Sequence, residues 1–284
     1  MKLERLPFRK KPPAVAVLRL DGVITASGSR LRGSGLNIQG QAARIERAFK
    51  VPKLQAVALI VNSPGGSAVQ SALIAGHIRA LAEENEVPVF AFAEDVAASG
   101  GYWLACAADE IYVNEASIIG SIGVVSSGFG FHELIARYGI ERRVHTAGES
   151  KATLDPFQPE KPEDVAHLKQ TQEEVHAHFK DYIRARRGAR IDPASSTLFT
   201  GEFWTGQRAV TLGLADGIGD IRTVMRNKYG KDVRFVPISE RKSMLRSILG
   251  RSGTAGSWHD PLAGLPEQAL SALEERAVWA RFGL

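Results

Sequence analysis

One pattern most constrains how this 284-residue sequence can fold. An apolar run leads through a glycine-rich turn into a segment with helical spacing, and the same order of segments then occurs a second time. Residues 55–62 are mostly apolar and precede Ser63-Pro64-Gly65-Gly66-Ser67, after which apolar residues recur at helical spacing to about residue 84. Residues 87–93 form a second apolar run, and the small, apolar stretch 99–108 follows it. Apolar runs without alternation are typical of strands covered on both faces. This order predicts parallel β-α-β units and an α/β fold.

The remaining elements are predicted from the same periodicities. The further strands are expected at Ala14–Leu20, Glu110–Val113, Ile122–Val125 and Glu141–Thr146. The further helices are expected at Phe131–Tyr138, Pro162–Arg187, Thr205–Leu212, Ile221–Tyr229 and Pro266–Phe282. We therefore expect a basic tail over residues 1–13, one domain over residues 14–240, and a linker with a C-terminal amphipathic helix over residues 241–284.

Composition excludes several classes of protein. Hydrophobic residues make up 44% and charged residues 24%, which argues against a disordered or fibrous chain. No apolar run approaches the roughly 18–20 residues of a membrane helix, and no secretory signal is visible, so a cytoplasmic location is expected. The single cysteine, Cys106, excludes an internal disulfide and a cysteine-rich metal site. Histidine and carboxylate spacings match no metal motif, so we expect neither a metal nor a cofactor.

The net charge of +5 is mild for a chain of this length. Nucleic-acid binding is not expected, because basic residues are not gathered with aromatic or motif support. Near the N-terminus, a local excess of basic residues could attract anionic lipid and give peripheral contact with the inner membrane. These residues are Lys2, Arg5, Arg9, Lys10 and Lys11.

Two glycine-rich turns are the candidate site. The first contains Gly65-Gly66, and the second is Ala97-Ala98-Ser99-Gly100-Gly101-Tyr102. Each alone could be a tight turn or a helix N-cap. Because the carboxyl ends of parallel strands meet at one edge of a sheet, both turns are expected there together. A serine beside unobstructed backbone N–H groups provides a nucleophile and an oxyanion hole.

A serine nucleophile also needs a base, and no histidine is nominated by its surroundings in the sequence. A lysine can accept the proton where burial lowers the pKa of its ammonium group. Lys151 follows the predicted strand at 141–146, and Glu149 is the only acidic residue immediately before it.

Four motifs in order give the chain a family resemblance. They are Asn62-Ser63-Pro64-Gly65-Gly66-Ser67, Ala98-Ser99-Gly100-Gly101-Tyr102, Gly120-Ser121-Ile122-Gly123-Val124, and Phe203-Trp204-Thr205-Gly206-Gln207-Arg208-Ala209 continuing to Leu212-Gly213-Leu214-Ala215-Asp216. The sequence from about Ala14 to Val236 resembles serine/lysine peptidases of the signal peptide peptidase type, the SppA and SohB proteins. These proteins usually carry an N-terminal membrane anchor, and none is expected here, because no apolar run is long enough to span a membrane.

The resemblance implies a ClpP/crotonase-like spiral fold of repeated β-β-α units, with parallel sheets flanked by helices. It also implies roles for individual residues: Ser99 as the nucleophile, Lys151 as the general base, Ser121 as the residue that orients the lysine, and Gly66 and Gly100 as backbone donors of the oxyanion hole. Expected substrates are peptides with small or apolar residues, such as leftover signal peptides or membrane-derived fragments. The resemblance further implies a homo-oligomeric ring and no cofactor.

Two alternatives remain open at this stage. A crotonase-type acyl-CoA enzyme would hold a thioester enolate on the same N–H groups and would need a carboxylate near the turns, for which Glu94 and Asp95 are available. A non-enzymatic ring scaffold at the membrane surface would need no intact site.

Overall fold

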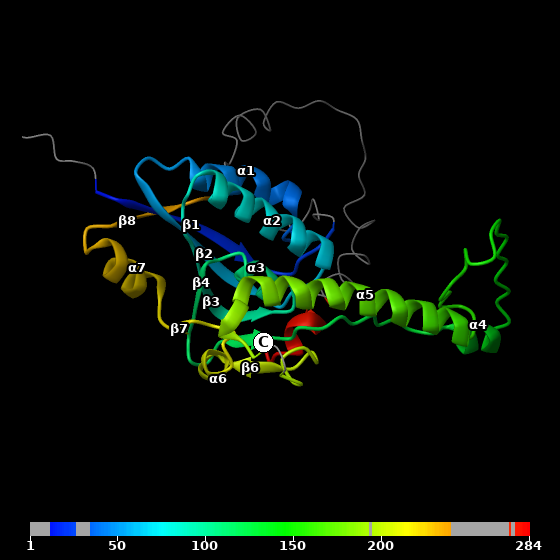
Figure 1. The fold of residues 1–284 in the computed structure, drawn as a ribbon. Coiled ribbons are helices and arrows are strands. Elements are labelled where there is room, and N and C mark those ends of the chain that lie inside the picture. Colours follow the sequence, from blue (N-terminus) through cyan, green and yellow to red (C-terminus); the bar gives the residue numbers. More distant parts are fainter. Residues whose placement is uncertain (1–11, 27–34, 193–194, 240–272, 274–275) are drawn as a thin grey trace, which may run out of the picture.

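The computed structural model describes residues 12–26, 35–192, 195–239, 273 and 276–284 (Figure 1). The strands lie at β1 (Ala14–Asp21), β2 (Leu54–Ser63), β3 (Val89–Ala98), β4 (Glu110–Val113), β5 (Ile118–Gly120), β6 (Phe203–Thr205), β7 (Gly217–Ile218) and β8 (Arg234–Pro237). The α-helices lie at α1 (Ile38–Phe49), α2 (Ala68–Glu84), α3 (Gly100–Ala105), α4 (His132–Arg137), α5 (Pro162–Arg187), α6 (Gly206–Thr211) and α7 (Ile221–Tyr229).

The described strands form one mostly parallel sheet in the order β6-β5-β3-β2-β1-β8. β3 pairs with β2 along one side. On its other side it pairs first with β4, through residues 90–93, and then with β5, through residues 96–98. Among the described strands, only β6 runs antiparallel, against β5. The α/β class and the mostly parallel sheet expected from the sequence are confirmed.

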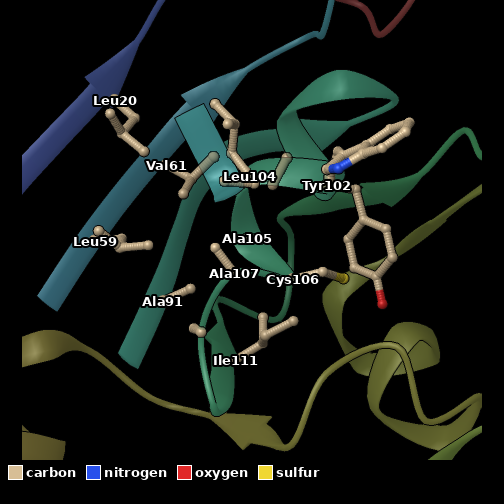
Figure 2. Packing of buried hydrophobic residues seen from close by; sticks show 14 of the residues in the cluster. Leu20, Leu59, Val61, Ala91, Tyr102, Leu104, Ala105, Cys106, Ala107 and Ile111 are labelled. Atoms are coloured by element: carbon tan, nitrogen blue, oxygen red, sulfur yellow. The ribbon is translucent and has the colours of Figure 1, made fainter. Parts of the chain in front are cut away.

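Alternate strand residues face two apolar layers. On β1, Leu18 and Leu20 belong to the main core, which α1, α2 and α3 complete, whereas Val15 faces a smaller cluster that includes Met225 of α7. Figure 2 shows Leu104 and Ala105 of α3 among side chains from the neighbouring strands. Because helices cover both faces, the central strands carry apolar residues without alternation, which is the pattern their sequence displays.

Residues 123–161 form an arm that projects from the body at the N-terminal end of α5 (Figure 1). None of residues 124–161 is buried. The strands expected at Ile122–Val125 and Glu141–Thr146 are wrong: β5 ends at Gly120, and residues 140–146 have no regular structure. Their apolar and β-branched residues suit a strand, but neither segment pairs with any strand in the part of the chain that the structure describes.

The elements near the C-terminus are described only in part. Much of the expected helix Pro266–Phe282 lies outside the described residues, although residues 276–280 are helical. The Phe282 ring packs edge-on against Phe203 of β6, with 5.2 Å between ring centroids. The basic residues of the N-terminal tail also lie outside the described part of the chain. Within that part, no helix combines the length and the apolar character that a membrane crossing requires.

Candidate active site

Ser99 is the junction between β3 and α3. Its backbone has φ 52° and ψ −122°, a conformation that costs a non-glycine residue about 1–3 kcal/mol. The strain is held from both sides, since the Ser99 N–H donates to Gly120 O at 2.8 Å and its carbonyl accepts from Trp103 N–H at 3.0 Å. The half-buried side chain makes no capping hydrogen bond to α3. The serine is therefore not explained as a helix cap.

The Gly65–Gly66 turn is held by the segment that follows β1. Ile24 N–H donates to Gly65 O, and Ser67 N–H donates to Ile24 O, both at 2.8 Å. Gly66 has φ 136°, and a Cβ atom there would lie 2.0 Å from Ile24 O. Only glycine fits this position. Sequence reasoning missed Ile24, because its contribution comes from backbone atoms that any residue type carries.

The two glycine turns meet as expected. A Cβ atom on Gly65 would lie 2.8 Å from both Gly100 N and Ser99 Cβ, and one on Gly100 would lie 3.4 Å from Gly66 N. Among the described residues, neither the Gly66 N–H nor the Gly100 N–H has a hydrogen-bond acceptor. Two unpaired backbone donors next to a serine hydroxyl can stabilise negative charge that develops on a carbonyl oxygen.

Ser121 directly follows β5, the strand beside the turn that carries Ser99. β5 pairs Gly120 with Ala98, so Ser121 follows Gly120 as Ser99 follows Ala98. Ser121 also has a positive φ, 53°, and is 7% exposed. Its N–H donates to Glu202 O at 2.6 Å, while the Trp204 ring lies so close to Gly120 that a Cβ atom there would be 2.8 Å from it. The β6 segment thus holds Ser121 in place, a role for Trp204 that its motif alone did not reveal.

Lys151 lies apart from these residues, on the projecting arm. It is exposed, and its side chain has neither a hydrogen-bond nor an ion-pair partner in the part of the chain that the structure describes. The arm is held internally, through Phe131 N–H to Pro156 O at 2.6 Å and Arg142 Nε to Asp155 at 2.9 Å. The structure brings Ser99, Ser121, Gly66 and Gly100 together and leaves Lys151 outside this group.

Other titratable groups near the turns are already engaged. Glu94 accepts two hydrogen bonds from Arg19, and Asp95 accepts one from Asn62. His176 of α5 contacts the Ile122 carbonyl through Nε2 at 3.1 Å, and burial lowers the pKa of its imidazole. Burial raises the pKa of the Cys106 thiol to about 12, so this thiol is unreactive at neutral pH. Among the described residues, no group of three or more metal-ligating side chains comes together.

Comparison with known proteins agrees with this geometry. A sequence model described as Peptidase family S49 matches residues 82–233, more than half of the chain. The chain belongs to peptidase family S49. It is 29% identical over 251 residues to "Serine protease SPPA, chloroplastic" of Arabidopsis thaliana, covering 85% of this chain and 37% of that protein. The resemblance to the SppA type is thereby confirmed.

A more similar relative has a different name. The chain is 46% identical over 280 residues to a Brucella abortus protein called "Na(+)/H(+) antiporter NhaA", covering 98% of this chain and 38% of that protein. The chain thus spans less than two fifths of either relative's length, and the antiporter name describes a much longer protein.

A solved structure supports the fold assignment. A mutant of the 1510-N membrane-bound stomatin-specific protease, in complex with a substrate peptide, superimposes with a TM-score of 0.50 at 14% identity. The similarity covers 84% of this chain and 96% of the other. At this level of identity the match concerns the fold alone.

Proposed function

We propose that this S49 family chain is a serine endopeptidase in which Ser99 is the nucleophile and Lys151 the general base. The observation that carries the proposal is the strained Ser99, whose side chain caps no helix and which lies beside the unpaired N–H groups of Gly66 and Gly100. Holding a hydroxyl at positive φ costs stability, and such strain concentrates at functional sites.

The proposed reaction proceeds through an acyl-enzyme. The Ser99 hydroxyl adds to the substrate carbonyl while its proton passes to the Lys151 amine. The Gly66 and Gly100 N–H groups stabilise the oxyanion, and collapse of this intermediate breaks the peptide C–N bond as the lysine protonates the leaving amine. A water molecule, deprotonated by the same amine, then releases the acyl group from Ser99. Ser121 orients the amine by hydrogen bonding.

Lys151 must approach Ser99 for this chemistry, because a base acts only within hydrogen-bond reach of the proton. Two arrangements can achieve this: the arm folds back onto its own body, or the arm of one chain enters the site of a neighbouring copy. Exposed apolar side chains on the arm, including Val125, Phe129 and Tyr138 at 67%, 81% and 72%, favour a packed partner. We propose that this partner is a second copy in a homo-oligomeric ring.

The proposed substrates are hydrophobic peptides such as leftover signal peptides or membrane-derived fragments. An apolar site suits small or apolar side chains next to the scissile bond. Exposed Val124 follows Ser121 closely and offers an apolar contact there. A cytoplasmic location with peripheral contact at the inner membrane would suit such substrates, and it stays a prediction.

A fluorophosphonate probe tests the proposal. The probe should modify Ser99 covalently, as read by peptide mass spectrometry, and Ser99→Ala should abolish both labelling and hydrolysis of an apolar peptide. A crotonase-type enzyme would not need Ser99, and a scaffold would hydrolyse nothing. Normal peptide hydrolysis by folded Ser99→Ala would contradict the assignment.

A further inference from the structure

β3 contains a bulge just before the turn that carries Ser99. Val61 of β2 pairs with Ala93, and Ser63 pairs with Ala97. One residue on β2, Asn62, therefore stands opposite three on β3, residues 94–96. Bulges bend a strand and redirect the residues beyond them. This one marks the point where the partner of β3 changes from β4 to β5.

Asn62 spans the bulge with both ends of its amide. Its Nδ2 donates to Asp95 Oδ2 at 3.1 Å, and its Oδ1 accepts from the Val96 N–H at 3.2 Å. The side chain thus replaces a ladder hydrogen bond that the bulge removes. Ser117 Oγ contacts the Glu94 carbonyl from the opposite side. Asn62 thus contacts both a side chain and a backbone N–H of the bulge, those of Asp95 and Val96.

The bulge determines how far β3 reaches towards the oxyanion donors. If its two extra residues joined the regular strand, everything beyond would advance by about 7 Å, at roughly 3.3 Å per residue. Ser99, three residues after Val96, would then no longer face Gly66. Catalytic geometry tolerates displacements of only about 0.5 Å.

We propose that Asn62 is a positioning residue that fastens this bulge and thereby sets the place of Ser99 relative to Gly66 and Gly100. The inference rests on the proposed function, since it takes Ser99 as the nucleophile. Asn62 does not contact the reacting atoms in this assignment; it acts through Asp95 and Val96.

Exchanging the amide and the carboxylate between positions 62 and 95 tests whether Asn62 fastens the bulge. Asn62→Asp keeps an acceptor for the Val96 N–H but places two carboxylates face to face. In the double variant Asn62→Asp with Asp95→Asn, the new amide donates to the new carboxylate and the bond is restored with reversed polarity. Asp95→Asn alone keeps an amide-to-oxygen bond. Asn227→Asp, on the exposed face of α7, is the control for the same chemical change elsewhere.

The rate of fluorophosphonate labelling at Ser99 is the readout, together with kcat and KM for an apolar peptide. Asn62→Asp should lower the labelling rate and kcat by about 10- to 100-fold with little change in KM. The double variant should recover most of both, and Asp95→Asn and Asn227→Asp should stay near wild type. An unchanged rate in Asn62→Asp, or a double variant as slow as Asn62→Asp, overturns the inference. Should Asn62→Asp fail to fold, Asn62→Ser, too short to reach both partners, must be slow instead.

Failure of the proposed function gives a different pattern. If wild-type Ser99 is not labelled at all, the peptidase assignment falls, and hydrogen exchange of the Val96–Ser99 amides in the same variants decides about Asn62. Faster exchange in Asn62→Asp that the double variant reverses supports fastening of the bulge. Exchange that is equal in all variants overturns it.

Discussion

The Arg187 guanidinium donates two hydrogen bonds to the Asp216 carboxylate, at 2.8 and 3.1 Å, with only 2% of the arginine side chain exposed. Arg187 also donates to Gly213 O, and Asp216 accepts from the Ile111 N–H at 2.7 Å. The pair therefore ties the C-terminal end of α5 to β4 and to the turn after α6. In the same turn, Leu214 O accepts a hydrogen bond from the Tyr102 hydroxyl at 2.8 Å.

Removing one partner of this pair should destabilise the fold strongly. Arg187→Met removes the buried cation of the pair and leaves the Asp216 carboxylate with the more exposed Arg190, whose Nε lies 3.1 Å from it. Loss of one member of a buried pair costs up to about 3–5 kcal/mol. Urea unfolding followed by circular dichroism measures this. Lys50→Gln, which removes an exposed pair with Glu46, is the control and should change stability little. An Arg187→Met midpoint equal to that of the control would contradict the structural role.

Relief of the Ser99 strain should be measurable as stability. Ser99→Gly and Ser99→Ala both lose the hydroxyl, and only glycine adopts φ 52° without strain. Ser99→Gly should exceed Ser99→Ala in unfolding free energy by about 1 kcal/mol. At Ser71, inside α2, the order should reverse, since glycine costs about 1 kcal/mol relative to alanine in a helix. The same order at both positions would argue against strain at Ser99.

Mixing two inactive variants distinguishes the two routes by which Lys151 reaches Ser99. Ser99→Ala and Lys151→Ala should each lose several orders of magnitude in kcat, and the double variant should lose no more. If the arm enters a neighbouring copy, unfolding and co-refolding the two single variants in equal amounts should restore about a quarter of the sites. If the arm serves its own body, activity stays absent in the mixture. Active Lys151→Ala alone would mean that another group is the base.

Lowering the pH should weaken the attachment of the arm to the body, because His176 contacts Ile122 where the arm begins. Burial lowers the pKa of this imidazole below its usual 6.5, so the unfolded chain binds the proton more readily. The stabilisation is complete above about pH 6.5 and is lost as the pH falls through the lowered pKa. Limited proteolysis should cut residues 123–161 faster at pH 5.5 than at pH 7.5 in wild type. His176→Gln, which keeps a donor for Ile122 O, should reduce that difference, whereas His178→Gln should leave it unchanged.

The sequence correctly predicted those helices and strands whose apolar pattern follows directly from which of their side chains are buried. Pro162–Arg187 and Ile221–Tyr229 have the expected bounds, because each has a clear start and a glycine at its end. α1 was missed, although Asn37 caps it by accepting from the Gly40 N–H at 2.8 Å. The short strands β6, β7 and β8 were also missed, since so few residues carry little periodicity, although the four-residue β4 was predicted with its observed bounds.

The site was predictable to the extent that it consists of glycine turns at strand ends. Parallel topology brings Ser99, Gly66 and Gly100 together without long-range information beyond the order of the elements. The contributions of Ile24 and Asn62 depend on backbone contacts and on a change of register, which no local pattern encodes. In the proposed mechanism, the approach of Lys151 to Ser99 depends on how the arm folds back or packs, which no local pattern encodes.

Because α5 is anchored at its C-terminal end, a small rotation of this helix moves the arm at its N-terminal end by a large distance. Its buried residues, Phe179, Ile183 and Arg187, all lie in the last third of a 26-residue helix. At 1.5 Å per residue the helix is about 39 Å long, so a pivot of about 10° at the anchored end would carry the tip through about 7 Å. A rotation too small to disturb the core could therefore move the Lys151 segment by more than the width of a side chain. In the proposed mechanism, the position of Lys151 could then be changed from a distance while Ser99 and its turn stay as they are.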